Sequence, residues 1–339
     1  MKAVGYQQSL AITEPAALLD IELPQPVATG RDLLVKVAAI SVNPVDTKVR
    51  KRAAPPAGEY KVLGWDAAGE VVAVGPEVSN FQVGDRVYYA GALQRQGSNA
   101  EYQLVDERIV GKMPANLNFE QAAALPLTAL TAWELLFDRL ELATPSLKHP
   151  KPVLLVTGAA GGVGSILVQL ARQLTTVTVV ATASRPETQQ WVKELGAHYV
   201  VDHSQPLIPQ LQQLGIAAVS HVASLTQTDL HYAELVQLLA PQGKLALIDD
   251  PANGIDIMPL KQKSISVHWE FMFTRSLFST ADMVVQQQIL NDLSRLIEQG
   301  QIKTTLKQSY GTINASNLKQ AHALLESGKA VGKIVLSGF

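Results

Sequence analysis

The chain has 339 residues, a formal net charge of −2 and no cysteine. Its length predicts two domains, and its charge gives no reason to expect attraction to nucleic acid or to an anionic membrane. Without cysteine, the protein has no disulfide, thiol nucleophile, iron–sulfur cluster or cysteine-bound zinc.

No apolar segment approaches the roughly 20 residues that a membrane-spanning helix needs. The N-terminal segment 1–20 carries Lys2 but no apolar core of signal-peptide length. We therefore expect a cytoplasmic protein without membrane or nucleic-acid partners. The seven histidines show no His-Glu-x-x-His spacing, which disfavours a zinc site of histidine and carboxylates without excluding it.

The first hundred residues indicate a small barrel or rolled sheet, because short apolar runs alternate with glycine and proline. Strands are predicted over Lys2–Tyr6, Leu18–Leu23, Asp32–Val42, Ala67–Val74, Asp85–Tyr89, Ala100–Val105 and Ile109–Lys112. The segment Asn43–Lys48 follows a strand and is predicted to be a turn. Trp65 is either a packed core aromatic, the commoner case, or the wall of a ligand site.

The segment after Phe119 changes to helix-forming residues. A helix over Glu120–Leu125 is interrupted by Pro126 and resumes over Leu127–Phe137, and the proline-rich Leu142–Pro152 is a connection. From Val153 onward strands and helices alternate, which predicts a parallel, doubly wound sheet. The predicted elements are strands over Val177–Thr182, His198–Val201, Ala217–Val222, Lys244–Ile248 and Ile265–His268, and helices over Glu187–Leu195 and Leu230–Ala240.

This alternation ends near residue 263. The remainder predicts helices over Asp282–Gln299 and Ser316–Ser327 and a strand over Gly332–Leu336. We expect it to return to the first domain. The predicted domains are therefore residues 1–122 together with 264–339, and residues 123–263.

A glycine-rich loop joins the first strand of the alternating region to its first helix. Val153–Val156 is a buried-strand pattern, and Leu167, Leu170, Ala171 and Leu174 form one helix face. Such a loop gathers backbone N–H groups where a pyrophosphate can bind. The dinucleotide template G-x-G-x-x-G falls on Ala159, Gly161 and Gly164, so alanine replaces its first glycine. The predicted phosphate-binding residues are Gly158, Ala159, Ala160, Gly161, Gly162, Val163 and Gly164; the alternative is a plain tight turn.

The end of the second strand indicates which dinucleotide binds. An acidic residue about 20 positions after the glycines would bond the ribose hydroxyl of NAD, but here the strand ends in Ser184-Arg185. Arginine and serine can donate charge-assisted hydrogen bonds to a 2′-phosphate. This pair favours NADPH, with a surface-exposed Arg185 of no function as the alternative.

Several motifs spread over the chain resemble the medium-chain dehydrogenase/reductase superfamily, in its zinc-free quinone-oxidoreductase branch. They are Asn43–Asp46, Gly64–Gly69, Val83–Val87, Leu130–Ala132, Gly158–Gly164 and Gly332–Leu336. More narrowly, Trp269–Arg275 resembles a segment typical of bacterial zinc-type alcohol dehydrogenase-like proteins. The resemblance implies a GroES-like β-barrel catalytic domain interrupted by a Rossmann domain, with the active site between them and homodimers formed through the Rossmann sheet edge.

The same resemblance implies site residues. Asn43 and Trp65 match the positions of a cysteine and a histidine that hold catalytic zinc in other members, so no zinc is expected. Thr131 would contact the nicotinamide and His203 would lie near the adenine. Ile248, Phe271, Met272 and Phe273 would line the nicotinamide channel, and Lys333 would approach the cofactor. For His203, Ile248 and Lys333 alone, a purely structural role is an equal alternative.

The implied reaction is hydride transfer from NADPH to a quinone or to the β-carbon of an enone or enal. A tyrosine common in relatives is replaced by Lys48, which is either a cation near a developing enolate or, more commonly, a solvated lysine. Asn43 or Lys48 could hydrogen-bond the acceptor oxygen, and Trp65 and Trp269 could line an apolar substrate pocket. The rival functions are a zinc alcohol dehydrogenase and a non-catalytic NADPH-binding protein, as among lens crystallins.

Overall fold

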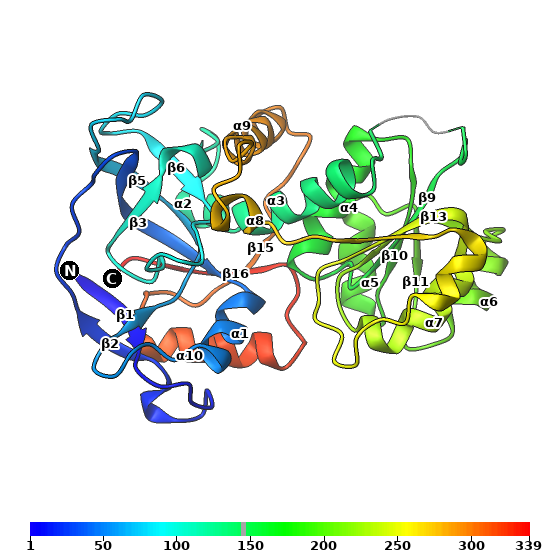
Figure 1. Ribbon diagram of the computed structural model, residues 1–339, viewed down its shortest axis with the longest axis horizontal. Coiled ribbons are helices and arrows are strands. Elements are labelled where there is room, and N and C mark those ends of the chain that lie inside the picture. The colour runs from blue at the N-terminus through cyan, green and yellow to red at the C-terminus, as the bar shows by residue number, and fades with distance from the viewer. Residues whose placement is uncertain (144–146) are drawn as a thin grey trace. The chain divides into compact units, whose positions relative to one another are not determined.

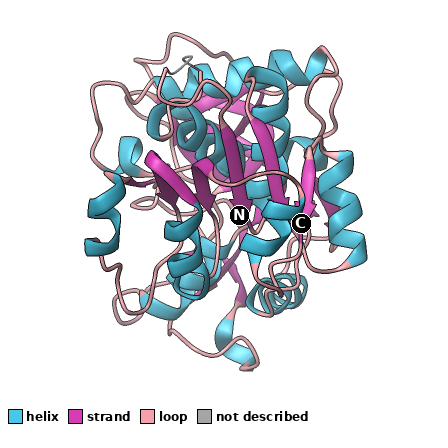
Figure 2. Ribbon diagram, turned by 90° about the vertical axis from the view of Figure 1, so that its right-hand side faces the viewer, coloured by secondary structure: helices cyan, strands magenta, loops and turns pink. Residues whose placement is uncertain are grey.

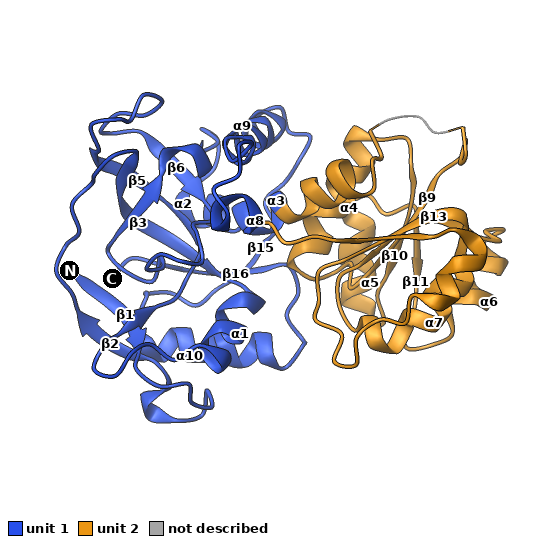
Figure 3. Ribbon diagram, viewed as in Figure 1, with its two compact units in different colours: residues 1–130, 273–339 blue, residues 131–272 orange. Residues whose placement is uncertain are grey.

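The computed structural model describes residues 1–143 and 147–339, which form two compact units (Figures 1 and 3). Unit 1 comprises residues 1–130 and 273–339, and unit 2 comprises residues 131–272. Both boundaries lie later in the chain than those proposed from the sequence, at 122/123 and 263/264. The predicted connection over Leu142–Pro152 includes residues 144–146, which lie outside the described residues.

Unit 2 is built on six parallel strands in the order β11-β10-β9-β12-β13-β14. In Figure 2, which views the molecule from the side of this unit, helices lie on both sides of the strands. The strands are β9 (Val153–Thr157), β10 (Thr178–Thr182), β11 (Tyr199–Val201), β12 (Val219–Ser224), β13 (Leu239–Leu247) and β14 (Ser266–Trp269). The sheet grows outward from β9 in both directions, which confirms the doubly wound arrangement. Its strands are apolar runs because helices cover both faces of such a sheet.

The helices of unit 2 follow the predicted alternation, with one addition. They are α4 (Gly162–Leu174), α5 (Pro186–Glu194), α6 (Leu207–Gln213) and α7 (Thr228–Leu238), and a 3-10 turn over Met258–Lys263 precedes β14. The addition is α6, which contains Pro209 and was not predicted. Its spacing of Leu207 and Leu211, both buried, was the signal that could have found it.

Unit 1 contains a seven-stranded sheet and a three-stranded sheet. Strand β3 (Asp32–Val42) pairs with β5 along one edge and shares the other between β16 and β7. The remaining strands of the large sheet are β5 (Asp66–Val74), β6 (Arg86–Tyr89), β7 (Tyr102–Asp106), β8 (Val110–Lys112), β15 (Leu306–Ser309) and β16 (Lys333–Ser337). The small sheet has the order β2-β1-β4, with β1 (Lys2–Tyr6), β2 (Leu19–Glu22) and β4 (Lys61–Val62). The pairing of β16 with β3 joins the C-terminal segment to the first strands of the chain.

The turn predicted over Asn43–Lys48 is wrong, because α1 (Pro44–Arg52) begins there. Proline at the first helical position has its φ angle already fixed, and the missing N–H costs nothing there. The side chain of Asp46 in the first turn accepts the backbone N–H of Asn43 at 2.7 Å. The same residue types therefore serve a turn or a helix start, and here they start a helix.

The remaining helices belong mostly to unit 1. They are α2 (Phe119–Ala123), α3 (Pro126–Trp133), α8 (Thr274–Leu277), α9 (Val285–Glu298) and α10 (Ala315–Glu326), with 3-10 turns over Pro15–Ala17 and Glu107–Ile109. A π-helix, η3 (Glu134–Arg139), continues α3. The unit boundary falls within α3, which explains why no turn residue marks it in the sequence.

A buried histidine on α10 makes the stability of the protein sensitive to acid. Neither ring nitrogen of His322 has a hydrogen-bond partner within the described residues. Burial, then the charges of Arg50 and Lys51, lower the pKa of His322 from 6.5 to about 3. Between these values the unfolded chain binds the proton and the folded chain does not, so stability falls as the pH falls through this window.

The substitution His322→Leu is therefore expected to flatten the acid side of the stability profile. Within the window, wild type should lose roughly 1 kcal/mol more of its unfolding free energy per pH unit than the variant. Urea unfolding at several pH values measures this difference. The partly exposed His231 provides the control variant His231→Leu. Parallel acid profiles for wild type and His322→Leu would contradict the assignment.

Candidate active site

The glycine loop lies where the carboxyl end of β9 meets the N-terminus of α4. Gly158 follows the strand with a φ of +64°, a left-handed conformation that glycine adopts without strain. Gly161 precedes the helix, and no side chain caps that end. Because the first N–H groups of a helix lack intrahelical partners, the loop leaves them available to an anion.

Gly164 is required by the packing of this loop. A Cβ atom at this position would lie 2.5 Å from the Cα and the backbone oxygen of Ala159. At Gly161 the nearest atom would be the backbone oxygen of Gly158 at 3.3 Å, a much milder contact. These positions fit the template, in which the last glycine allows close packing of helix on strand. The loop therefore fits the pyrophosphate of a dinucleotide.

The residues predicted to bind the 2′-phosphate lie beyond the carboxyl end of β10, and His203, predicted to lie near the adenine, follows β11. Ser184 and Arg185 are partly exposed and precede α5. The Arg185 guanidinium forms an ion pair with Glu187, Nε to Oε1 at 3.0 Å. His203 lies close enough for the charge of Arg185 to contribute to the lowering of its pKa, after burial and His231. Its ring meets that of His231 edge-on at 6.2 Å.

The residues predicted to line the nicotinamide channel, together with Trp269 of the predicted substrate pocket, fall into two groups. In unit 2, Thr131 is buried on α3, Ile248 follows β13, and Met272 is buried at the end of the unit. Trp269 and Phe271 are 54% and 47% exposed. Phe273 belongs to unit 1, where it is 2% exposed. Its ring packs edge-on against Trp65, with centroids 6.0 Å apart.

Trp65 and Lys48 are two further predicted residues of unit 1, and they differ in exposure. Trp65 is 2% exposed, which makes it a core aromatic in this structure. Lys48 is partly exposed on α1.

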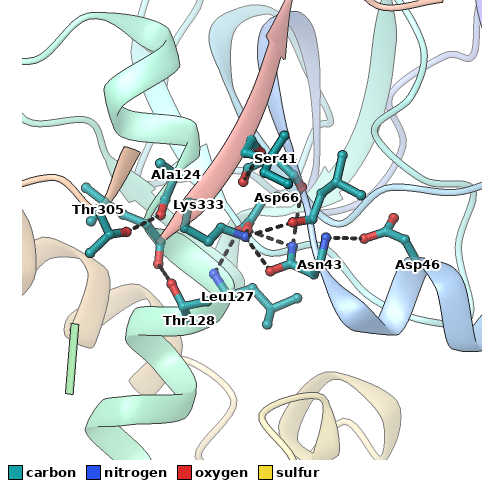
Figure 4. A network of polar contacts seen from close by, with 12 residues as sticks. Ser41, Asn43, Asp46, Asp66, Ala124, Leu127, Thr128, Thr305 and Lys333 are labelled. Carbon is teal, nitrogen blue, oxygen red and sulfur yellow. Dashed lines mark hydrogen bonds and ion pairs between the residues drawn. The ribbon is translucent and has the colours of Figure 1, made fainter. Parts of the chain in front are cut away.

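A buried polar network in unit 1 surrounds Lys333, and we call Asn43, Asp66 and Lys333 the Lys333 cluster (Figure 4). The ammonium of Lys333 donates to Asp66 Oδ2 at 3.0 Å, to the backbone oxygen of Val42 at 3.2 Å and to Asn43 Oδ1. The Asn43 amide nitrogen donates to Asp66 Oδ2 at 2.8 Å. Leu127 N–H donates to Asp66 Oδ1 at 2.7 Å. All three cluster side chains are at least 97% buried.

Asp46 lies beside this cluster as a second buried carboxyl group. Burial raises its pKa to about 7, the charge of Asp66 adds to the rise, and hydrogen bonds from the backbone of Asn43 and Gly64 together with the charge of Lys333 oppose it. Sequence reasoning left Asp46 and Asp66 out of the site. Both belong to motifs quoted above, in which asparagine, proline, glycine and aspartate are typical of turns.

The donor groups at this place do not fit zinc. The carboxylate of Asp66 and the amide oxygen of Asn43 are both bound to the ammonium of Lys333, which neutralises the carboxylate and takes up both oxygens. Indole and amide side chains are not zinc ligands of known structural or catalytic sites. No group of three or more histidine, cysteine, aspartate or glutamate residues that could hold a metal occurs among residues 1–143 and 147–339.

Comparison with known proteins places the whole chain in a family. Residues 29–115 match the alcohol dehydrogenase GroES-like domain, and residues 195–336 match the zinc-binding dehydrogenase family. A zinc-type alcohol dehydrogenase-like protein of Staphylococcus aureus is 41% identical over 99% of this chain and 100% of its own length. The chain belongs to the medium-chain dehydrogenase/reductase superfamily, in its quinone oxidoreductase-like branch. The resemblance inferred from the motifs is thereby confirmed.

Solved structures of this superfamily share the fold. A Rhizobium etli protein with a provisional zinc-dependent alcohol dehydrogenase name is 57% identical, with a TM-score of 0.97 over 100% of this chain and 98% of that chain. The Escherichia coli quinone oxidoreductase, solved in complex with NADPH, is 26% identical, with a TM-score of 0.84 over 99% of this chain and 100% of that chain.

Two further superfamily relatives have named activities. A quinone oxidoreductase of Pseudomonas aeruginosa is 32% identical over 92% of this chain and 93% of its own length. A 2-methylene-furan-3-one reductase of tomato is 31% identical over 90% of this chain and 71% of its own length. These relatives support an oxidoreductase that acts on small molecules.

Proposed function

We propose that the chain is an NADPH-dependent reductase of quinones or α,β-unsaturated carbonyl compounds that works without zinc. The observation that carries the proposal is the Lys333 cluster, in which a buried lysine is bound to the oxygens that a metal would need. A conjugated acceptor does not require a Lewis acid, because the charge that arrives with a hydride spreads onto its own oxygen. The named relatives that reduce quinones and an enone-type furanone support the same class.

NADPH, when bound, supplies a hydride from its nicotinamide ring. The first N–H groups of α4 would hold its pyrophosphate, and Ser184 and Arg185 would hold its 2′-phosphate. Asn43 donates its amide N–H groups to Asp66 and to the Ser41 carbonyl, so we assign it to the Lys333 cluster. Lys48 then becomes the candidate for bonding the acceptor oxygen.

The direct test uses protein purified in the presence of a chelator, with NADPH and a panel of acceptors. We expect 1,4-benzoquinone and but-3-en-2-one to consume NADPH, and acetone to leave it unchanged. Zinc added back should not increase the rate. Consumption that depends on zinc would favour an alcohol dehydrogenase, and NADPH binding with no consumption by any acceptor would refute the enzymatic proposal.

The substitution Arg185→Ala is expected to weaken NADPH binding by about tenfold to a hundredfold, because a charge-assisted hydrogen bond to the 2′-phosphate is lost. The dissociation constant for NADH, which lacks this phosphate, should stay unchanged. Calorimetric titration with both cofactors measures the two constants. Lys193→Ala, which removes an exposed cation from α5, the helix that Arg185 precedes, is the matched control. Equal weakening for both cofactors would contradict recognition of the phosphate by Arg185.

The remaining questions are membrane association, oligomeric state and cellular location. Within the described ranges, no helix has both the length and the apolar character needed to cross a membrane. We propose a homodimer joined through an edge of the unit 2 sheet, and a cytoplasmic location. Light scattering on the purified chain tests the first of these predictions.

A further inference from the structure

Unit 2 contains a second group of charged side chains, two of them buried, that the proposed reaction does not use. Glu134 begins the π-helix η3, Arg139 ends it, and Glu270 directly follows β14. The two glutamates are only 1% and 3% exposed. Arg139 Nε donates to Glu270 Oε2 at 2.9 Å, and Arg139 Nη2 lies 3.9 Å from Glu134 Oε2. A π-helix costs helical stability and is often retained at functional places.

The single guanidinium of Arg139 faces both carboxyl groups and can balance only one negative charge. The buried pair therefore favours a state in which one of the two carboxyl groups is protonated. Burial, followed by the charge and the hydrogen bond of Glu134, raises the pKa of Glu270 to about 9, and Arg139 opposes the rise. The nearest other titratable group on β14 is His268, whose pKa burial, Lys244 and Arg139 lower and Glu141 raises.

The position of Glu270 determines to which side the side chains of its neighbours Trp269 and Phe271 point. Its N–H donates to the Leu247 oxygen at 3.0 Å, so the extended pairing of β14 with β13 continues through this residue. Neighbouring side chains of an extended segment point to opposite sides. With Glu270 anchored inside, Trp269 and Phe271 are therefore directed outward, which agrees with their exposure of 54% and 47%.

We propose that Glu134, Arg139 and Glu270 are positioning residues that hold Trp269 and Phe271 as the aromatic wall for the conjugated acceptor. The inference rests on the proposed function for its acceptor. The contact of Arg139 with Glu270 ties the 269–271 segment to the helix that carries Thr131 one turn before Glu134. When the protonated carboxyl group ionises, two buried carboxylates repel each other across one guanidinium, and the tie is weakened.

The first experiment needs no enzyme activity. Protein labelled with 5-fluorotryptophan gives one fluorine resonance per tryptophan, and Trp269→Phe identifies that of Trp269. In wild type this resonance is expected to shift as the pH rises, with a midpoint near 9, the pKa of Glu270. In Glu270→Gln, which keeps the shape and cannot ionise, it should stay in place. A Trp269 resonance that does not move in wild type, or moves equally in both proteins, would overturn the proposal.

The second experiment separates binding from chemistry. With NADPH saturating, Glu270→Ala is expected to raise the KM for 1,4-benzoquinone about tenfold and to change kcat less than about threefold, because the wall is misplaced while the hydride donor is not. In wild type the KM for 1,4-benzoquinone should rise at alkaline pH, as the tie is weakened. The KM of Glu270→Gln should equal that of wild type below about pH 8 and should not show this rise. The exposed Glu194 on α5 supplies the control Glu194→Gln.

The two experiments also distinguish the two proposals. If no acceptor consumes NADPH while the Trp269 resonance titrates as described, the proposed reaction fails and the positioning cluster stands. If benzoquinone is reduced and Glu270→Ala changes neither KM nor the Trp269 resonance, the cluster proposal fails alone. Should Glu270→Ala not fold, Glu270→Gln still decides the case through its pH profile.

Discussion

Lys333→Met is expected to lower the free energy of unfolding by about 3–5 kcal/mol, the cost of leaving a buried charge without its partner. Asp66 is fully buried, and its Oδ2 atom accepts from Lys333 and from Asn43. Methionine fills the space of the lysine stem but supplies no donor, so the carboxylate keeps its desolvation cost and loses its cation. Chemical denaturation of wild type and variant measures the difference.

A double variant provides the control for this prediction. In Lys333→Met with Asp66→Asn both charges are absent, so the pair should cost clearly less than the sum of the two single changes. Lys36→Met on the exposed face of β3 should change stability by less than about 0.5 kcal/mol. A Lys333→Met protein as stable as wild type would show that the buried ion pair described here does not form.

Gly164→Ala is expected to destabilise the chain by about 1–3 kcal/mol and to weaken NADPH binding at least tenfold. The new methyl group would meet the backbone of Ala159 at 2.5 Å. The backbone of Ala159 cannot rotate away from the new methyl group as a side chain could. The N-terminus of α4 must therefore shift away from the loop. Thermal unfolding and cofactor titration follow the two effects separately.

Gly161→Ala distinguishes the role of the glycine loop in NADPH binding from its role in stability. Its Cβ would contact only the Gly158 oxygen at 3.3 Å, so stability should change by less than about 1 kcal/mol. Binding should still weaken, because the second glycine of the template is where the backbone approaches the pyrophosphate. Unchanged NADPH affinity in both variants would mean that the loop is a structural turn without a bound dinucleotide.

The strands and the glycine loop were open to prediction because their signals are local. Strand β3 matches the predicted range Asp32–Val42 residue for residue, since its apolar run is bounded by turn residues. The helix α4 follows from the spacing of its leucines. Helix α1 was missed for an equally local reason, because an asparagine followed by proline signals a turn and a helix start alike.

The polar clusters were beyond such reasoning. Lys333 and Asp66 are separated by 267 positions in the chain, and no local period reports that contact. Glu134 and Glu270 each lie within an apolar stretch. A single acidic residue in such a stretch is usually interpreted as solvent-exposed, so the pattern does not indicate a buried charged group. Only the sheet order of unit 2 brings the end of β14 to the π-helix. The composition shows that the chain has no cysteine. That Lys333 binds the side-chain oxygens of Asn43 and Asp66 follows only from the three-dimensional structure.

The most direct test of the proposed chemistry follows the hydride itself. Chelator-treated protein is given but-3-en-2-one and NADPH that carries deuterium at the transferable position of the nicotinamide, and the product is examined by mass spectrometry and NMR. We expect butan-2-one with one deuterium on the former β-carbon, formed without added zinc. Recovery of unchanged enone, or of an allylic alcohol with deuterium on the carbonyl carbon, would contradict a zinc-independent reduction of the conjugated double bond.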